Sequence, residues 1–146
     1  MKQKKNIYII MEMARRELHG NLLLTLVSLK KNFKIYLSDS NTYRYLINNN
    51  LINPGIIHTK SITHGNAKST FHQKLFEKNF LITAIDEEHG LLDDYDYEEY
   101  FITNRLSSKE LKKTAAFFCW GKYDFDILTF VEFFFELKRI VNPLLI

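Results

Sequence analysis

Charged side chains that could bind a substrate follow the first hydrophobic run of the sequence. Arg15, Arg16, Glu17 and His19 lie within five consecutive positions. A guanidinium can donate two parallel hydrogen bonds to a phosphate or a carboxylate, and a carboxylate can take part in proton transfer. We therefore treat Arg15, Arg16 and His19 as candidate binding residues and Glu17 as a candidate catalytic residue. The alternative is a solvated loop with an arginine–glutamate pair, which contributes little to stability.

A second group of candidates combines a cation, hydroxyls and a glycine in the segment 60–66. A phosphate or a sugar hydroxyl could bind to such a segment, and Lys60 and Ser61 are its candidate binding residues. Ordinary turns have the same composition, so a purely structural role remains the alternative.

Three adjacent carboxylates, Asp86, Glu87 and Glu88, follow the fourth hydrophobic run, and Gly121 follows the fifth. Carboxylate oxygens can hold a divalent cation, but three adjacent side chains cannot all face one ion, so no metal site is predicted. One carboxylate could instead act as a base towards a sugar hydroxyl. Asp86 and Glu87 are candidate catalytic residues, and Glu88 and Gly121 are candidate binding residues. Solvated loop charges are the alternative.

Several common kinds of site are excluded by the residues that the sequence lacks. It has neither the glycine-rich fingerprint of dinucleotide-binding proteins nor the phosphate-binding loop of nucleotide hydrolases, and it has no nucleophile elbow. The single cysteine, Cys119, cannot form an internal disulfide or a cysteine-based zinc site, and we expect it to be a small buried hydrophobe. No cofactor is predicted.

Length and composition predict one globular domain. The chain has 146 residues, of which 46% are hydrophobic and 25% charged. The net charge of +3 is too small to indicate a nucleic-acid-binding protein. It averages a basic start, with eight Lys and Arg in the first 34 positions, and an acidic segment, with eight Asp and Glu between positions 86 and 99. The first apolar run stops at Glu12 and is too short for a signal peptide or a transmembrane helix, so a cytoplasmic protein is expected.

The elements that must position these residues alternate between strand and helix patterns. Strands are predicted over 6–11, 33–37, 56–59, 80–85 and 114–120, and a sixth strand is expected near the C-terminus. Helices are predicted over 21–31, 40–48, 67–78 and 124–138, with a short helix from Ser107 and a polar loop over 12–20. The leucines of 21–31 lie mostly on one helical face. Asp39 or Ser40 can cap the helix over 40–48, and Glu110 is at the capping-box position of the short helix from Ser107. This order is typical of an α/β fold with a doubly wound, mostly parallel, Rossmann-like sheet of five or six strands and helices on both faces.

Four phenylalanines lie close together on the last predicted helix, namely Phe130, Phe133, Phe134 and Phe135. One helix face cannot bury all of them against a single sheet. Large exposed apolar patches usually mark interfaces, so we expect this helix to pack on another domain or subunit.

The run from Met11 to Leu24 resembles the opening of bacterial surface carbohydrate biosynthesis proteins. These are glycosyltransferase-like proteins with two Rossmann-like domains in the GT-B arrangement. The segments 54–61, 84–90 and 117–121 agree with that family in order and spacing. The resemblance implies that this chain is the N-terminal, acceptor-side domain, that the C-terminal donor-binding domain is absent, and that this chain alone is inactive.

The resemblance also implies the partners and the roles of the candidate residues. The partners would be a sugar acceptor and a nucleotide-sugar donor, the latter a substrate of the complete enzyme. Arg15, Arg16 and Glu17 would bind acceptor or donor charge, and Lys60 and Ser61 would line the cleft. One of Asp86, Glu87 and Glu88 would contact sugar hydroxyls or act as base. The alternatives are a non-catalytic Rossmann-like interaction module and an inactive remnant of a truncated gene.

Overall fold

The protein contains a six-stranded parallel sheet with the strand order β2-β1-β3-β4-β5-β6. The computed structural model describes residues 5–86, 97–135 and 140–141, without the side chains of 130–135 and 140–141. The strands are β1 (Asn6–Ile10), β2 (Lys34–Ser38), β3 (Ile56–Thr59), β4 (Leu81–Ile85), β5 (Thr114–Phe118) and β6 (Ile140–Val141). This sheet confirms the predicted α/β, Rossmann-like fold.

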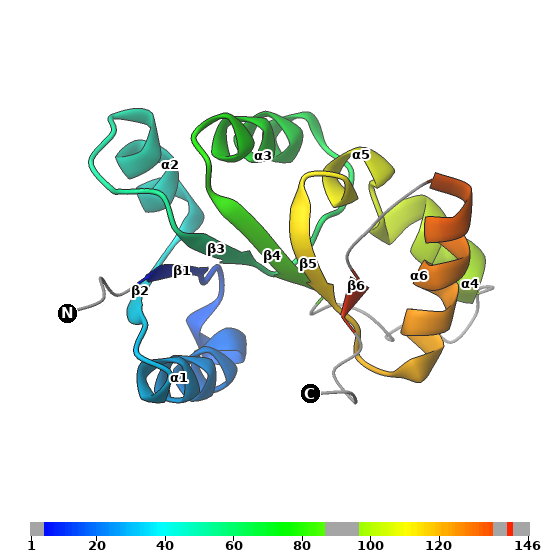
Figure 1. Ribbon diagram of the computed structural model, residues 1–146, viewed down its shortest axis with the longest axis horizontal. Helices are drawn as coiled ribbons and strands as arrows, with labels where there is room; N and C mark the ends of the chain where they lie inside the picture. Colours follow the sequence, from blue (N-terminus) through cyan, green and yellow to red (C-terminus); the bar gives the residue numbers. More distant parts are fainter. Residues whose placement is uncertain (1–4, 87–96, 136–139, 142–146) are drawn as a thin grey trace.

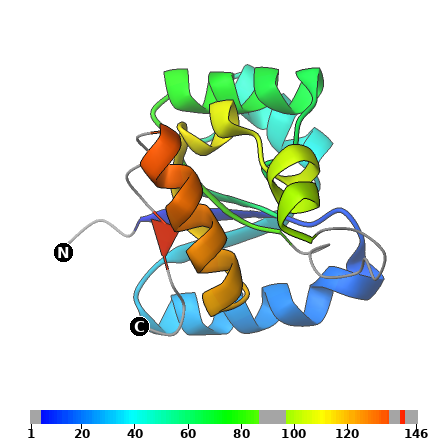
Figure 2. The same ribbon diagram turned by 90° about the vertical axis from the view of Figure 1, so that its right-hand side faces the viewer.

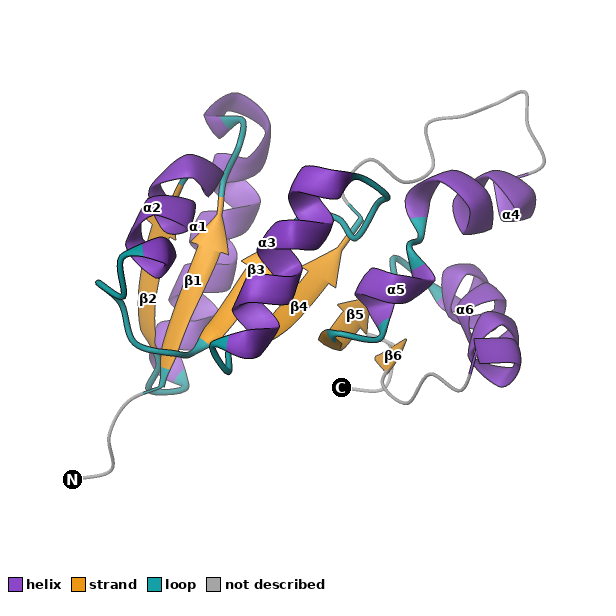
Figure 3. Cartoon of the chain, turned by 90° about the horizontal axis from the view of Figure 1, so that it is seen from above, coloured by secondary structure: helices purple, strands orange, loops and turns teal. Residues whose placement is uncertain are grey.

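Helices lie on both faces of the sheet (Figure 1). They are α1 (Ala14–Lys30), α2 (Ser40–Asn48), α3 (Asn66–Glu77), α4 (Tyr97–Tyr100), the π-helix η1 (Phe101–Arg105), α5 (Ser108–Leu111) and α6 (Lys122–Phe135). We call the face covered by α2, α3 and α5 the upper face (Figure 3), and the opposite face, on which α1 lies, the lower face. Figure 2 shows the same two layers from the side. Among the described helices, α1 is the one that packs below the sheet.

Apolar side chains fill the upper face. One cluster joins β1, β3 and β4 to α2 and α3, and a second joins β4 and β5 to η1, α5 and α6. The first contains Tyr8, Ile10, Tyr43, Ile47, Ile57, Phe71, Leu75, Phe80 and Ile82. The second contains Ile62, Ala84, Phe101, Leu106, Leu111, Phe117, Cys119, Ile127 and Leu128. Cys119 is free and buried, as expected from the sequence.

Helix α1 corrects one expectation from the sequence and also departs from the usual pattern of an amphipathic helix. It begins at Ala14, so most of the predicted polar loop over 12–20 is helical, because Ala, Arg, Glu and Leu favour a helix and a single glycine interrupts them. Its buried side chains are Glu17, Asn21 and Ser28. An apolar stripe normally faces the core. Here the large apolar side chains of the helix are instead exposed, namely Leu18, Leu22, Leu23, Leu24, Leu26, Val27 and Leu29.

The other element boundaries lie close to the predicted ones, with two informative differences. Asp39 caps α2 by accepting hydrogen bonds from the backbone N–H groups of Asn41 and Thr42, as expected. The side chain of Ser107 makes no such bond at α5, so the capping box predicted with Glu110 does not form. Strand β5 ends at Phe118, two residues before the predicted end.

Some expectations fall on parts of the chain that lie outside the described residues. These are the roles of Glu87 and Glu88, the acidic segment as far as residue 96, and the packing of the side chains of Phe130, Phe133, Phe134 and Phe135. Within the described ranges, no helix is both long enough and apolar enough to cross a membrane.

Candidate functional site

Charged side chains converge at the edge of the sheet where the parallel strands end. Lys60, directly after β3, forms an ion pair with Glu12, two residues after β1, at 2.7 Å between Nζ and Oε2. Asp86, directly after β4, accepts two hydrogen bonds from Arg105, from Nε at 2.7 Å and from Nη2 at 2.5 Å. Open α/β sheets bind ligands beyond the carboxyl ends of their strands. We call these four residues the edge network.

Glu17 anchors the loop that brings Glu12 to the edge network. Glu17 is only 4% exposed, and its Oε2 atom accepts a hydrogen bond from the backbone N–H of Glu12 at 2.7 Å. The other oxygen, Oε1, accepts one from Nη2 of Arg16 at 3.2 Å. Both oxygens are therefore engaged, and the first turn of α1 is tied to the loop after β1. A buried carboxylate needs such partners, since burying an unpaired charge is costly.

Lys68, in the first turn of α3, joins the loop after β3 to the same network. Its Nζ donates hydrogen bonds to Oγ of Ser61 at 2.5 Å and to Oγ1 of Thr63 at 3.0 Å. Burial lowers the pKa of Lys68, and the positive charges of Lys60 and Arg105 lower it further, while Glu12 and Asp86 oppose them. The pKa of Lys68 is thus affected by all four members of the edge network.

Trp120 closes the site on the side of β5. Its indole Nε1 donates a hydrogen bond to the backbone carbonyl of Asp86 at 2.5 Å, and its backbone N–H donates to Oδ2 of Asp124 at 3.0 Å. The hydroxyl of Tyr97 donates to Oδ1 of Asp124 at 2.8 Å. Trp120 nevertheless stays 61% exposed, so its ring is available for contact.

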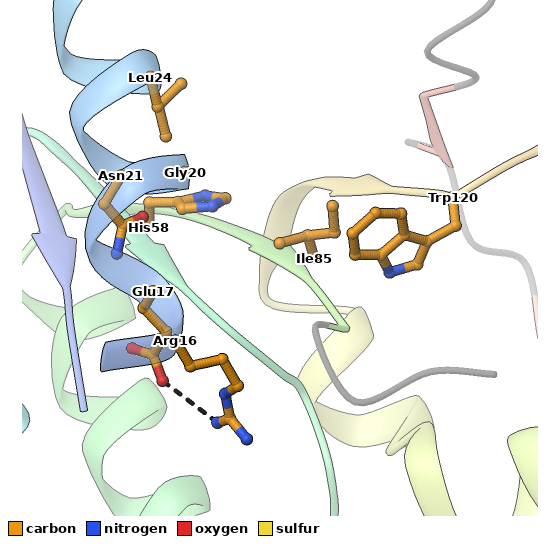
Figure 4. Close-up of a pocket in the computed structure, with 8 residues that line it drawn as sticks. All are labelled: Arg16, Glu17, Gly20, Asn21, Leu24, His58, Ile85 and Trp120. Carbon is orange, nitrogen blue, oxygen red and sulfur yellow. Dashed lines mark hydrogen bonds and ion pairs between the residues drawn. The ribbon is translucent and has the colours of Figure 1, made fainter. Parts of the chain in front are cut away.

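A pocket of about 360 Å³ lies between α1 and Trp120 on the lower face (Figure 4). It is lined by Arg16, Glu17, Gly20, Asn21, Leu24, His58, Ile85 and Trp120. Asn21 and His58 lie side by side on one wall, and Ile85 and Trp120 lie across from them. We call this the α1 pocket.

Two polar groups of the α1 pocket carry no charge. The Nδ1 atom of His58 lies 3.0 Å from Oγ1 of Thr83, and burial lowers the pKa of His58 to about 4, so its imidazole is neutral at pH 7. The Nδ2 atom of Asn21 is buried and has no hydrogen-bond partner within the described part of the chain. Buried amide donors are almost always paired, so this one needs an explanation.

The structure brings five of the sequence-predicted residues together: Arg16, Glu17, Lys60, Ser61 and Asp86. Three others do not take part in these contacts. Arg15 and His19 are exposed on α1, and Gly121 lies at the start of α6, where its carbonyl accepts a hydrogen bond from the N–H of Phe125. Their binding roles remain predictions, as do the catalytic roles of Glu17 and Asp86.

Sequence reasoning missed several residues that the fold brings to the site. Arg105 comes from η1, and π-helical turns often occur at functional sites. Lys68 lies at the start of α3, five residues after Thr63 and seven after Ser61, so its closeness to both hydroxyls in the sequence could have been noticed. Asn21 looked like an ordinary polar helix residue. Among the described residues, no group of three or more His, Cys, Asp or Glu side chains could hold a metal ion.

Comparison with models of protein families, with curated proteins and with solved structures finds no match to this chain. The edge network, the α1 pocket and the family resemblance of the sequence are therefore the features that bear on function.

Proposed function

We propose that this chain is the N-terminal, acceptor-side domain of a glycosyltransferase-like protein that acts in the cytoplasm on bacterial cell-surface polysaccharide. The observation that carries the proposal is the edge network, in which Glu12–Lys60 and Asp86–Arg105 meet at the carboxyl edge of a Rossmann-like sheet. Residues from both halves of the sequence contribute to it. If these two ion pairs only stabilised the fold, they would not need to lie at the edge of the sheet where α/β proteins bind ligands.

The proposed roles follow from the contacts. Lys60, Lys68 and Arg105 supply positive charge for the phosphates of a nucleotide-sugar donor or for a polar acceptor. Ser61 offers a hydroxyl beside Lys68. Asp86 is oriented by Arg105, and it contacts sugar hydroxyls or takes a proton from one of them once a substrate displaces part of this pairing. A second domain or a second chain supplies most of the donor site.

A transfer assay tests this proposal. The full chain is incubated with nucleotide-sugar donors, alone and with the product of the adjacent reading frame, and donor hydrolysis and transfer are measured. We expect turnover in the mixture. Lys60→Ala should lower it about 10- to 100-fold, since a hydrogen bond to a charged group contributes about 1.5–3 kcal/mol. Lys109→Ala, an exposed lysine on α5, is the matched control and should change nothing. Absence of turnover in both preparations, or equal effects of the two variants, would count against the proposal.

One observation favours a second candidate, a non-catalytic interaction module. The outward face of α1 exposes a row of leucines, and such patches usually mark contact surfaces. Under this proposal a Leu23→Glu variant would lose a partner that the wild-type chain retains in size-exclusion chromatography, while Lys60→Ala would keep it. The opposite pattern, with transfer lost in Lys60→Ala and elution unchanged in Leu23→Glu, favours the enzyme.

A further inference from the structure

Helix α1 presents an apolar surface that no described helix covers. The residues of α1 that face the sheet are polar, and its other sides point away from the sheet (Figures 1 and 2). Single exposed leucines are common in proteins, but many of them on one helix usually mark a contact surface. We call the following six residues, which are between 36% and 64% exposed, the leucine surface: Leu18, Leu22, Leu23, Leu26, Val27 and Leu29.

The exposed ionisable side chains of α1 are all basic. One row along the outward side of the helix, with spacings of three or four residues, consists of Arg15, His19, Leu22, Leu26 and Lys30. Leucines occupy the middle of this row, and basic residues occupy its two ends. The acidic residue of the helix, Glu17, is buried against the sheet. The outward side of α1 therefore combines leucines with cations and carries no carboxylate.

More lysines gather at the C-terminal end of α1. Lys31 follows Lys30 directly, and Lys34 begins β2 three residues later. The backbone N–H of Lys34 donates a hydrogen bond to the carbonyl of Lys5 at 2.9 Å, which brings a fourth lysine to this end of the helix. Lys5 and Lys34 also line a pocket of about 520 Å³ that has no carboxylate among its lining residues. All four lysines are exposed, and none forms an ion pair within the described ranges.

These charges decide against a second copy of the chain as the occupant of the leucine surface. If two α1 helices packed side by side in opposite directions, Arg15 of one copy would lie beside Lys30 of the other. In a parallel pair, each cation would lie beside its own counterpart. Like charges placed together across an interface repel, and no exposed carboxylate of α1 would relieve the repulsion. The surface fits an occupant that is apolar and negatively charged.

We propose that the outward side of α1 lies on the surface of an anionic lipid bilayer. The leucine surface enters the boundary between the headgroups and the acyl chains, and the cations at both ends of α1 bind lipid phosphates. Interfacial helices bind in this way, with a strength that depends on buried apolar area and on attraction to anionic lipids. A nucleic acid would attract the same cations but would leave the leucines in water. The inference goes beyond the proposed function and does not depend on it.

Vesicle flotation tests the inference directly. The full chain is mixed with vesicles of phosphatidylcholine alone, or of phosphatidylcholine with an equal amount of phosphatidylglycerol, and the floating fraction is measured against lipid concentration. We expect saturable binding to the anionic vesicles and at least about 10-fold weaker binding to the neutral ones. High salt should weaken binding to the anionic vesicles, because salt screens the attraction between the cations and the lipid.

Variants of the leucine surface test the apolar part of the interaction. Leu23→Glu and Leu26→Glu replace leucines of α1 that are 64% and 59% exposed. Their matched control is Leu51→Glu, in the loop after α2, where the leucine is also 59% exposed. Each α1 variant should weaken vesicle binding at least about 10-fold, because a carboxylate enters the lipid boundary poorly and is repelled by anionic lipid. Leu51→Glu should bind as the wild type does, and circular dichroism checks that all three variants are folded.

Variants of the lysines test the electrostatic part. Replacing both Lys30 and Lys31 by Gln removes two cations from the end of α1. Replacing both Lys109 and Lys112 by Gln, at α5 on the upper face, removes two exposed lysines as the matched control. The first double variant should bind anionic vesicles at least about 10-fold more weakly, and the second should bind them as the wild type does.

Three kinds of result would overturn the inference. The first is no binding to anionic vesicles, equal binding to both kinds of vesicle, or unchanged binding in Leu23→Glu and Leu26→Glu. The second is a dimer in sedimentation equilibrium without lipid that Leu23→Glu dissociates, which would assign the surface to a second copy. The third is competition by a short DNA duplex, which has phosphates but no acyl chains. None of these measurements needs a donor or a second chain, so failure of the transfer assay would leave the inference standing.

Discussion

The two faces of the sheet differ in what they bury. The upper face packs apolar side chains of the strands against those of α2 and α3, with Tyr8, Ile57 and Leu75 at most 2% exposed. On the lower face, α1 buries Glu17, Asn21 and Ser28 and exposes its leucines. The upper face is arranged for stability. The lower face keeps polar groups next to a pocket, an arrangement that stability alone does not explain.

Buried polar groups show the same difference. On the upper face His72 lies 2.9 Å from Glu110, which also pairs with Lys113 at 3.2 Å, so the buried carboxylate is neutralised. On the lower face the Nδ2 group of Asn21 has no partner within the described chain. Satisfied polar networks stabilise a fold, whereas a buried donor that is left unpaired costs about 1–3 kcal/mol of stability.

The largest expected difference between the faces is the loss of stability when a leucine is replaced by alanine. Leu75→Ala on the upper face should lower the free energy of unfolding by about 2–5 kcal/mol, because Leu75 is 1% exposed and truncation leaves a cavity. Leu23→Ala on α1 should change it by no more than about 0.5 kcal/mol, because Leu23 is 64% exposed. Urea denaturation of both variants measures this. Similar losses would mean that the outward side of α1 is buried, against the comparison.

Helix α1 shows how much of the difference between the two faces can be predicted from the sequence. The strands were predictable because β-branched runs such as 6–10 are continuous, and α2 was predictable because Asp39 is a good cap. The leucine periodicity of α1 indicated a helix, but periodicity does not say which side meets the sheet. That side is decided by the small and polar residues Asn21 and Ser28, which no hydrophobic pattern marks.

The site was predictable only in part, for a similar reason. Lys60 and Asp86 were found because they directly follow strands, and topology brings strand ends together. Arg105 reaches the same edge because it lies in η1, and Trp120 reaches it because β5 already ends at Phe118. No local sequence pattern predicts the π-helix or the early end of the strand. The unpaired state of Asn21 depends on the whole packing around it, so a sequence cannot show it.

The next largest predicted effect is a loss of folding stability at acidic pH. The pKa of His58 is lowered from 6.5 to about 4 by burial, so between these values the unfolded chain binds more protons than the folded chain. Stability from neutral His58 is therefore present above pH 6.5 and is lost as the pH falls to 4. The loss amounts to about 3 kcal/mol at 1.36 kcal/mol for each pKa unit.

A His58→Gln variant isolates that effect. The stability of the wild-type chain should fall by about 3 kcal/mol more than that of His58→Gln between pH 7 and pH 4, measured by urea denaturation at each pH. On the upper face, burial also lowers the pKa of His72, but the Glu110 carboxylate opposes that shift, so we expect a smaller effect of acid there. Parallel curves for the wild type and His58→Gln would show that the lower face does not bury a neutral imidazole.

The smallest predicted effect is on the free energy of unfolding when a glycine is replaced by alanine. Its sign is opposite at Gly20 and Gly55. Gly20→Ala should raise the free energy of unfolding by about 0.5–1 kcal/mol, because alanine favours the helix and its Cβ meets nothing within 4 Å. Gly55→Ala should lower it, because a Cβ there would lie 2.6 Å from the backbone oxygen of Asn6. Thermal unfolding of both variants gives the two signs. A destabilised Gly20→Ala would instead mean that α1 itself needs the glycine.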